Sequence, residues 1–192
     1  MSFNFLIRGI FIISLTFSSL SASFVLENDG FLPLKSVDKI NEMANELKVK
    51  TNISVYLIAK KTINNQNIKD YELEIVKTLN KPFVLLTFAH KETKIDIVSS
   101  KELSDKFDKD EILDNYIIPI LISKGKIPSK YGAGLFNGYT EIVDVLASEY
   151  DITLETSIDS SGRIIYYIVK YIFWAMIIGF FIAFLFVFKR KN

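Results

Sequence analysis

The sequence of 192 residues contains no cysteine and only one histidine, His90. The absence of cysteine excludes disulfides, thiolate metal sites and a cysteine nucleophile. A zinc-binding histidine pair is excluded too, and neither a phosphate-binding G-x-x-x-x-G-K loop nor a G-x-S-x-G elbow occurs. Charged residues make up only 23% of the chain, whereas 49% of the residues are hydrophobic. A chain of this composition is not intrinsically disordered, and its length allows one folded domain besides membrane segments.

The first 23 residues have the layout of a secretory signal peptide. Arg8 supplies positive charge, a short apolar run continues to Phe17, and mostly small residues follow. This layout predicts cleavage between Ser21 and Phe24. The alternative is an uncleaved anchor, although the apolar run is shorter than the roughly 20 residues that a membrane span needs.

A longer apolar run, residues 164–188, predicts one transmembrane helix near the C-terminus. Its last 18 residues, Tyr171–Phe188, carry no charge, and as a helix they would measure about 27 Å. Lys170 interrupts the run where a lysine can extend its ammonium group to the lipid headgroups. By the positive-inside rule, the basic tail 189–192 places the C-terminus in the cytoplasm and the preceding domain outside it. The alternative is a buried helix of a soluble domain, and such helices rarely carry so long an uncharged run beside a basic tail.

Between these segments, residues 24–150 are predicted to form one exported domain, and the polar residues 151–163 a tether. Residues 24–163 contain 18 basic and 22 acidic side chains, which gives a net charge near −4. Arg163 is the only arginine on the exported side. This charge argues against a nucleic-acid surface, and the scarcity of arginine argues against bidentate recognition of phosphate within the domain.

Hydrophobic periodicity predicts helices and strands in alternation. Helical spacing of apolar residues follows Ser36, which we expect to cap the first helix, and recurs over residues 68–79. Apolar and β-branched runs predict strands at Thr51–Ala59, Phe83–Ala89 and Lys94–Ser99, the last two joined by a hairpin. This order predicts an α/β layered sandwich, with a mixed, mostly parallel sheet flanked by helices, followed by the transmembrane helix.

The rest of the domain is predicted to be helical. One helix is expected over Glu111–Ile122, with a kink at Pro119, and a last one after Pro128. Gly134 and Gly138 lie four residues apart on that last helix. Because glycine lowers helix stability, we expect these positions to allow a close approach to the sheet or to a neighbouring helix.

Several stretches resemble the TPM domain, a family found in bacterial envelope proteins, thylakoid-lumen proteins and some animal membrane proteins. The resemblance is carried by the opening Asn28–Leu32, the adjacent strands Phe83–Ala89 and Ile95–Val98, and the helical segments Tyr116–Pro119 and Tyr131–Gly138. It implies an α/β sandwich, in agreement with the periodicity. With the two terminal segments, it also implies a single-pass protein of the bacterial inner (cytoplasmic) membrane whose main domain is periplasmic or otherwise extracytoplasmic.

The resemblance further implies weak acid phosphatase activity, calcium binding, or assembly and repair of membrane complexes. Many members carry an acidic pair before the strand that corresponds to Phe83–Ala89, where this chain has Asn80-Lys81-Pro82. An acidic site at that place is therefore not expected. We interpret the chain as a binding, assembly or maintenance module whose partner is a membrane protein or membrane complex, and no catalytic residue is assigned. The alternative function is a metal-assisted phosphomonoesterase.

The densest acidic group consists of Asp105, Asp108, Asp110, Glu111 and Asp114. Carboxylate oxygens at this density are suited to Ca²⁺, and Asp29 of the opening turn could complete the set. The spacing lacks the EF-hand pattern, however, and the acidic start of a helix accounts for the same residues. For His90, in the predicted hairpin turn, a solvated side chain is the expectation. The candidate metal ligands are thus Asp29, Asp105, Asp108, Asp110 and Glu111, for Ca²⁺ and no other cofactor.

Overall fold

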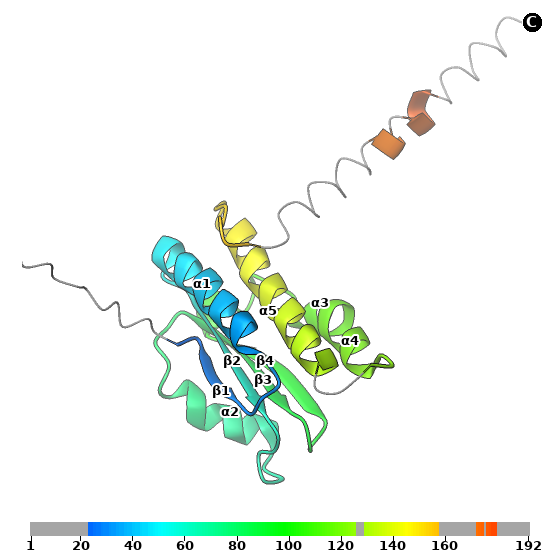
Figure 1. Cartoon of the computed structure of the whole chain (residues 1–192). Helices are drawn as coiled ribbons and strands as arrows, with labels where there is room; N and C mark the ends of the chain where they lie inside the picture. The colour runs from blue at the N-terminus through cyan, green and yellow to red at the C-terminus, as the bar shows by residue number, and fades with distance from the viewer. Residues whose placement is uncertain (1–22, 126–128, 158–171, 175, 180–192) are drawn as a thin grey trace, which may run out of the picture.

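The computed structural model describes residues 23–125, 129–157, 172–174 and 176–179 (Figure 1). Its sheet has four strands in the order β1-β2-β3-β4. Strands β1 (Val25–Asn28), β2 (Ser54–Lys60) and β3 (Phe83–Ala89) are parallel, and β4 (Lys94–Ser99) runs antiparallel to β3. The predicted α/β fold with a mixed, mostly parallel sheet is confirmed.

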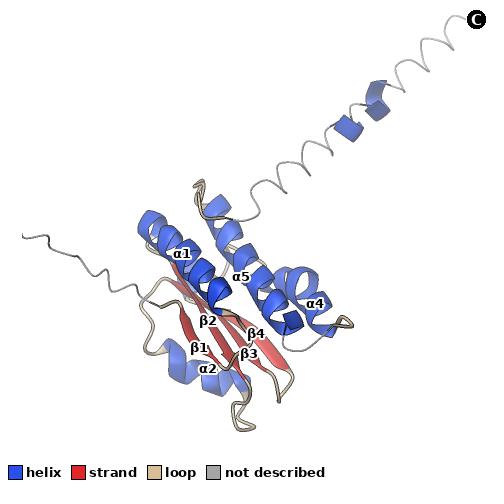
Figure 2. Ribbon diagram, viewed as in Figure 1, coloured by secondary structure: helices blue, strands red, loops and turns tan. Residues whose placement is uncertain are grey.

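Helices cover both faces of the sheet (Figure 2). One face carries α1 (Leu34–Thr51) and α5 (Ser129–Glu149), which pack against each other. The other face carries α2 (Ile68–Val76) alone. Two short helices, α3 (Lys109–Ile112) and α4 (Ile118–Ile122), pack against α5. The two faces are therefore covered unequally.

Strand β1 was not expected from the periodicity. It has four residues and pairs only with β2, at the edge of the sheet, so its pattern is too short to be distinguished from a loop. Strands β2 and β3, by contrast, bury every residue except Lys60. Such burial on both faces is what their continuous apolar runs predict.

The prediction that Ser36 caps the first helix is wrong. Helix α1 begins at Leu34, after Pro33, whose extended backbone stands in the capping position without a side-chain hydrogen bond. The helix also continues to Thr51, which the periodicity placed in the following strand. There the Thr51 hydroxyl donates a hydrogen bond to the Leu47 carbonyl at 2.7 Å and remains part of the last turn.

The helical run that precedes α5 is disturbed upstream of Pro119. Helix α3 is followed by a π-helical turn, Leu113–Ile117, and then by α4, in which Pro119 occupies the first turn. Proline has no N–H to donate to the carbonyl four residues earlier, so a wider turn in front of it accommodates the missing bond. The predicted kink is thus displaced by about one turn.

Neighbouring segments approach α5 closely at three glycines. A Cβ atom at Gly132 would lie 2.4 Å from the backbone oxygen of Phe31. At Gly134 it would lie 2.9 Å from Leu121 Cδ2, and at Gly138 it would lie 2.2 Å from Ile117 Cδ1. The expected close approach at Gly134 and Gly138 is confirmed, and the neighbouring segment is the π-helical turn with α4.

Residues 151–157, which we expected to begin a free tether, pack on the domain. The Leu154 side chain is buried, and the Ile152 N–H donates to the Ala147 carbonyl at 2.9 Å. The polar composition that indicated a tether reflects hydrogen bonds to the domain instead. The folded unit therefore extends at least to Ser157.

Glu46 of α1 holds this segment. Its carboxylate accepts hydrogen bonds from the backbone N–H groups of Glu155 and Thr156, at 2.8 and 2.9 Å. Burial alone would raise the pKa of Glu46, but the hydrogen bonds from Lys50, Thr156 and Glu155 together lower it to about 2. The carboxylate is therefore ionised at any physiological pH.

The predicted signal peptide, except Ser23, lies outside the described residues, as do Pro128 and most of the predicted span 164–188. Within the part of the chain that the structure describes, no helix is long and apolar enough to cross a membrane. The signal peptide, the span and the basic tail stay predictions.

Candidate functional site

The turn after β1 is held by its own polar side chains. Asn28 Oδ1 accepts hydrogen bonds from the backbone N–H groups of Phe31 and Leu32, each at 3.0 Å. Asp29 Oδ2 accepts a hydrogen bond from the backbone N–H of Lys61 at 2.8 Å. Asn28 and Asp29, the first two residues of the opening stretch Asn28–Leu32, thus stabilise a turn. This turn places Phe31 against β3 and α5.

Four rings meet where β3 enters the hairpin: Phe31, Phe88, His90 and Tyr131. The ring centroids of His90 and Tyr131 lie 4.7 Å apart with their planes at 82°, and those of Phe31 and Phe88 lie 5.3 Å apart at 83°. These edge-to-face arrangements are favourable for aromatic pairs. The expectation of a solvated His90 is therefore wrong, because the fold brings α5 over the hairpin and half-buries the imidazole.

A pocket opens beside these rings, between the β3–β4 hairpin and helices α4 and α5. Its volume is about 790 Å³, within the range of roughly 300–1,000 Å³ that is typical of small-molecule sites. Most of its wall is apolar or aromatic. We call it the hairpin pocket, and it is lined by Phe88, His90, Lys91, Thr93, Lys94, Ile95, Ile118, Leu121, Ile122 and Tyr131.

The hairpin brings positive charge to this pocket. Lys91 and Lys94 line it, and among the described residues no acidic side chain does. Glu92, which lies between them, turns to the loop before α2, where Oε1 accepts hydrogen bonds from the Thr62 hydroxyl at 2.6 Å and from two backbone N–H groups. The hydrogen bond from Thr62 and those from the backbone lower the pKa of Glu92 to about 2. Because its carboxylate faces that loop, Glu92 forms no ion pair with Lys91 or Lys94 among the described residues.

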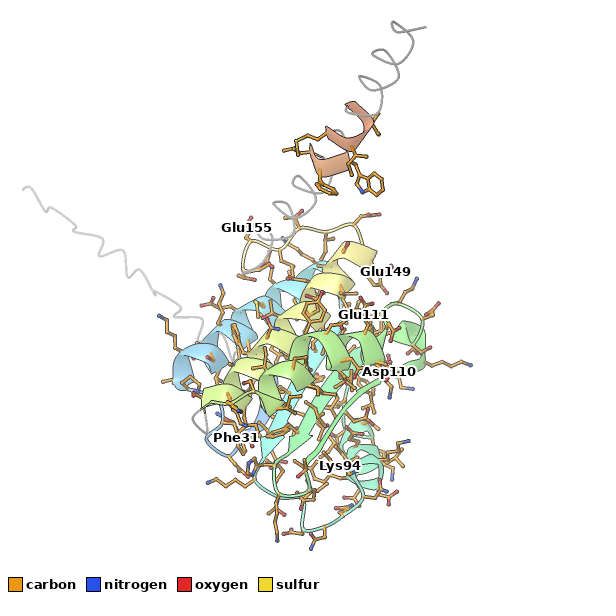
Figure 3. The ribbon with its side chains drawn as sticks, turned by 90° about the vertical axis from the view of Figure 1, so that its right-hand side faces the viewer. Phe31, Lys94, Asp110, Glu111, Glu149 and Glu155 are labelled. Atoms are coloured by element: carbon orange, nitrogen blue, oxygen red, sulfur yellow. The ribbon has the colours of Figure 1, made fainter. Side chains whose placement is uncertain are left out.

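The five candidate calcium ligands lie in different surroundings. Asp29 is engaged by the Lys61 backbone, as described above. Asp108 caps α3, and its Oδ1 accepts hydrogen bonds from the N–H groups of Asp110 and Glu111 at 2.9 and 3.1 Å. Figure 3 shows Asp110 and Glu111 well away from Phe31, which belongs to the same turn as Asp29. The helix-start interpretation therefore accounts for Asp108.

No group of three or more histidine, aspartate or glutamate side chains is placed to hold a metal ion in residues 23–125 and 129–157. A polar hollow of about 730 Å³ does run along β4, with Asp105 and Asp108 in its wall. Lysines in the same wall are paired with outside carboxylates, Lys106 with Glu149 at 3.0 Å and Lys109 with Asp96 at 3.2 Å. Calcium binding by this segment stays a prediction.

Glu72 of α2 is a buried acid that sequence reasoning missed. Its side chain is 2% exposed, and neither carboxylate oxygen has a hydrogen-bond partner among the described residues. Burial raises the pKa of Glu72 to about 7, and the nearby Asp96 adds to the effect, against a smaller opposing influence of Thr87 and Lys109. One signal was present in the sequence, since Glu72 lies four residues after Ile68 and three before Ile75, on the apolar stripe itself.

Comparison with known proteins agrees with this architecture. The TPM domain family matches residues 25–145. The solution NMR structure of the N-terminal domain of a protein from P. gingivalis superimposes with a TM-score of 0.60 at 15% sequence identity, covering 70% of this chain and 88% of that chain. At this identity the likeness concerns the fold alone. A search of curated proteins found no match. The family match spans well over half of the sequence, and the chain therefore belongs to the TPM domain family.

Proposed function

We propose that the chain is a membrane-anchored, extracytoplasmic binding module that serves a membrane complex. The position of the hairpin pocket carries this proposal. The pocket lies at the beginning of α5, whereas residues 151–157 follow the end of that helix, which measures about 31 Å over its 21 residues. In Figure 3, Phe31 and Lys94 accordingly lie at the opposite end of the domain from Glu149 and Glu155. A module anchored through the predicted span would turn its pocket away from the point of attachment.

Site-specific photo-crosslinking of the full chain in cells tests the proposal. The photoreactive amino acid replaces Ile122 of α4, which is 76% exposed at the rim of the pocket. The matched control replaces Leu73 of α2, which is 56% exposed on the other face. We expect an adduct with a membrane protein from position 122 and none from position 73. Equal adducts from both positions, or none from position 122, would refute the proposal that a partner binds specifically at the end of the domain that carries the hairpin pocket.

The topology that the proposal needs can be tested separately. A reporter that is active only in the cytoplasm should work when fused after Asn192 and fail when fused near Asp159. The reason is that the basic tail favours the cytoplasmic side, and the domain would then lie outside. The reverse pattern would contradict the localisation and the compartment of the partner.

A metal-assisted phosphomonoesterase remains the second candidate, and the polar hollow along β4 is the observation in its favour. Asp105 contributes a carboxylate to that hollow. Divalent-cation-dependent turnover of a phosphomonoester by the purified full chain, lost in Asp105→Asn, would support the enzyme. Asp108 is unsuitable for this test, because replacing a helix-capping residue itself costs about 1 kcal/mol of stability. The binding-module proposal expects no such turnover.

A further inference from the structure

The hairpin pocket has one wall that suits an apolar group. Phe88, from β3, is nearly fully buried at 4% exposure, whereas Ile122, from α4, is largely exposed at the rim. Leu121 and Tyr131 complete this wall from α4 and α5. Apolar side chains that line a pocket of this size and remain accessible to solvent are typical of ligand sites.

The aromatic part of this wall is fixed by packing. The Tyr131 ring lies against His90 at 4.7 Å and against Phe88 at 5.4 Å between centroids. Its chain neighbour Gly132 packs so closely against the Phe31 carbonyl that no Cβ atom would fit between them. A wall that is already ordered reduces the entropy lost on binding.

Another part of the pocket wall is cationic and belongs to a similarly fixed hairpin. The N–H groups of His90 and Lys91 donate to the carbonyls of Lys60 and Lys61, each at 2.9 Å, and tie the hairpin to the end of β2. No described carboxylate forms an ion pair with Lys91 or Lys94. The wall of the pocket therefore carries positive charge in a domain whose net charge is near −4.

We propose that the hairpin pocket binds a small amphipathic anion. The apolar body of the ligand lies against Tyr131, Leu121 and Ile122, and its carboxylate or phosphate lies beside Lys91 and Lys94. Charge complementarity favours an anionic ligand, because a neutral amphiphile would form no ion pair with the two lysines and a cationic one would be repelled by them. This inference goes beyond the proposed function, since it concerns a small ligand and not the protein partner.

Photoaffinity labelling of the full chain tests the assignment. The chain is placed in nanodiscs of zwitterionic lipid and labelled with a diazirine derivative of octanoate, and the labelled peptides are mapped by mass spectrometry. We expect labelling of the segments that carry Phe88, Ile122 or Tyr131. Octanoate and octyl phosphate are the competitors that distinguish a carboxylate from a phosphate ligand, and octanol is the neutral control. Octanol should compete at least about tenfold more weakly than the better anion.

Matched variants separate the two halves of the pocket. The double variant Lys91→Gln/Lys94→Gln should weaken labelling by about tenfold, whereas Lys77→Gln, an exposed lysine at the end of α2, should leave it unchanged. Ile122→Ser should also weaken labelling, and Leu73→Ser should not. Circular dichroism of each variant verifies that the domain remains folded.

Three results would overturn the assignment: labelling confined to other segments, equal competition by octanol and the anions, or equal labelling of the lysine double variant and the wild-type chain. The crosslink to a protein partner from position 122 is an independent readout. Loss of labelling with an intact crosslink refutes the ligand alone, and labelling without a crosslink refutes the proposed function alone.

Discussion

The two faces of the sheet are stabilised in different ways. On the α1–α5 face, most buried side chains are apolar, although α5 also buries Thr140, Glu141 and Asp144. The buried Tyr139 donates its hydroxyl to the Val55 carbonyl at 2.6 Å. On the α2 face, the one fully buried residue of the helix is Glu72, near the equally buried Thr87 of β3. Since unsatisfied buried polar groups cost stability and close apolar packing provides it, the first face should dominate stability and the second should make it pH-dependent.

Gly132→Ala should give the largest destabilisation, on the α1–α5 face. The new Cβ atom would meet the Phe31 carbonyl, a backbone atom that a side-chain rotation cannot move away. We expect a loss of about 3 kcal/mol in the free energy of unfolding, at the upper end of over-packing effects. Chemical denaturation of residues 24–157 measures it, and Gly125→Ala is the control, because its Cβ would make only an ordinary contact of 3.4 Å with Lys130. Equal stability of the two variants would contradict the close approach.

Glu72→Gln should remove a pH dependence that originates on the α2 face. The Glu72 carboxyl has a pKa of about 7 in the folded chain and an ordinary value of 4.5 otherwise. Below pH 4.5 both states hold the proton and stability is at its full value, and as pH rises through 7 about 3 kcal/mol is lost. The variant cannot ionise, so its stability should exceed that of the wild type above about pH 7.

The control for this prediction is Glu74→Gln, an exposed acid on the same helix. Its free energy of unfolding should follow the wild-type pH profile. A wild-type profile that is flat between pH 4.5 and 8 would show that Glu72 gains a partner in solution that satisfies its charge.

Glu46→Gln should have a smaller effect on the outer side of the α1–α5 face. The carboxylate accepts hydrogen bonds from Lys50 and from residues 155–156, and an amide would retain only part of them. We expect a loss of about 1–2 kcal/mol and faster amide exchange at Glu155 and Thr156. Glu42→Gln is the control, because Glu42 is exposed on the same helix and its carboxylate pairs with Lys39. Unchanged exchange at position 156 would show that the Glu46 carboxylate does not hold the segment.

Calcium should have the smallest effect of all. Because Asp108 caps α3 and Asp29 bonds the Lys61 backbone, we expect at most weak binding, with a dissociation constant of about 1 mM or more. Calorimetric titration of the full chain measures it. Micromolar affinity abolished by Asp29→Asn would reverse this expectation.

The periodic elements of the fold were predictable, and the candidate site was only partly so. Strands β2 and β3 and the apolar stripes of α1 and α5 are long enough to show their period, whereas β1 is too short. The hairpin pocket could not be found from the sequence, because its aromatic wall joins Phe88 and Tyr131 from two segments that are distant in the chain. Glu72 could have been found as an acid on an apolar stripe, although local pattern does not reveal that it is buried without a partner.

The docking of residues 151–157 has a consequence for effective concentration. A free tether over 151–163 could span about 40 Å, whereas the six residues 158–163 span at most about 20 Å before the predicted transmembrane segment. Because effective concentration varies with roughly the −3/2 power of tether length, halving the tether raises the effective concentration of a partner in the same complex by about threefold. A variant that releases Glu155 and Thr156 from Glu46 would thus weaken association with such a partner without altering any contact at the hairpin pocket.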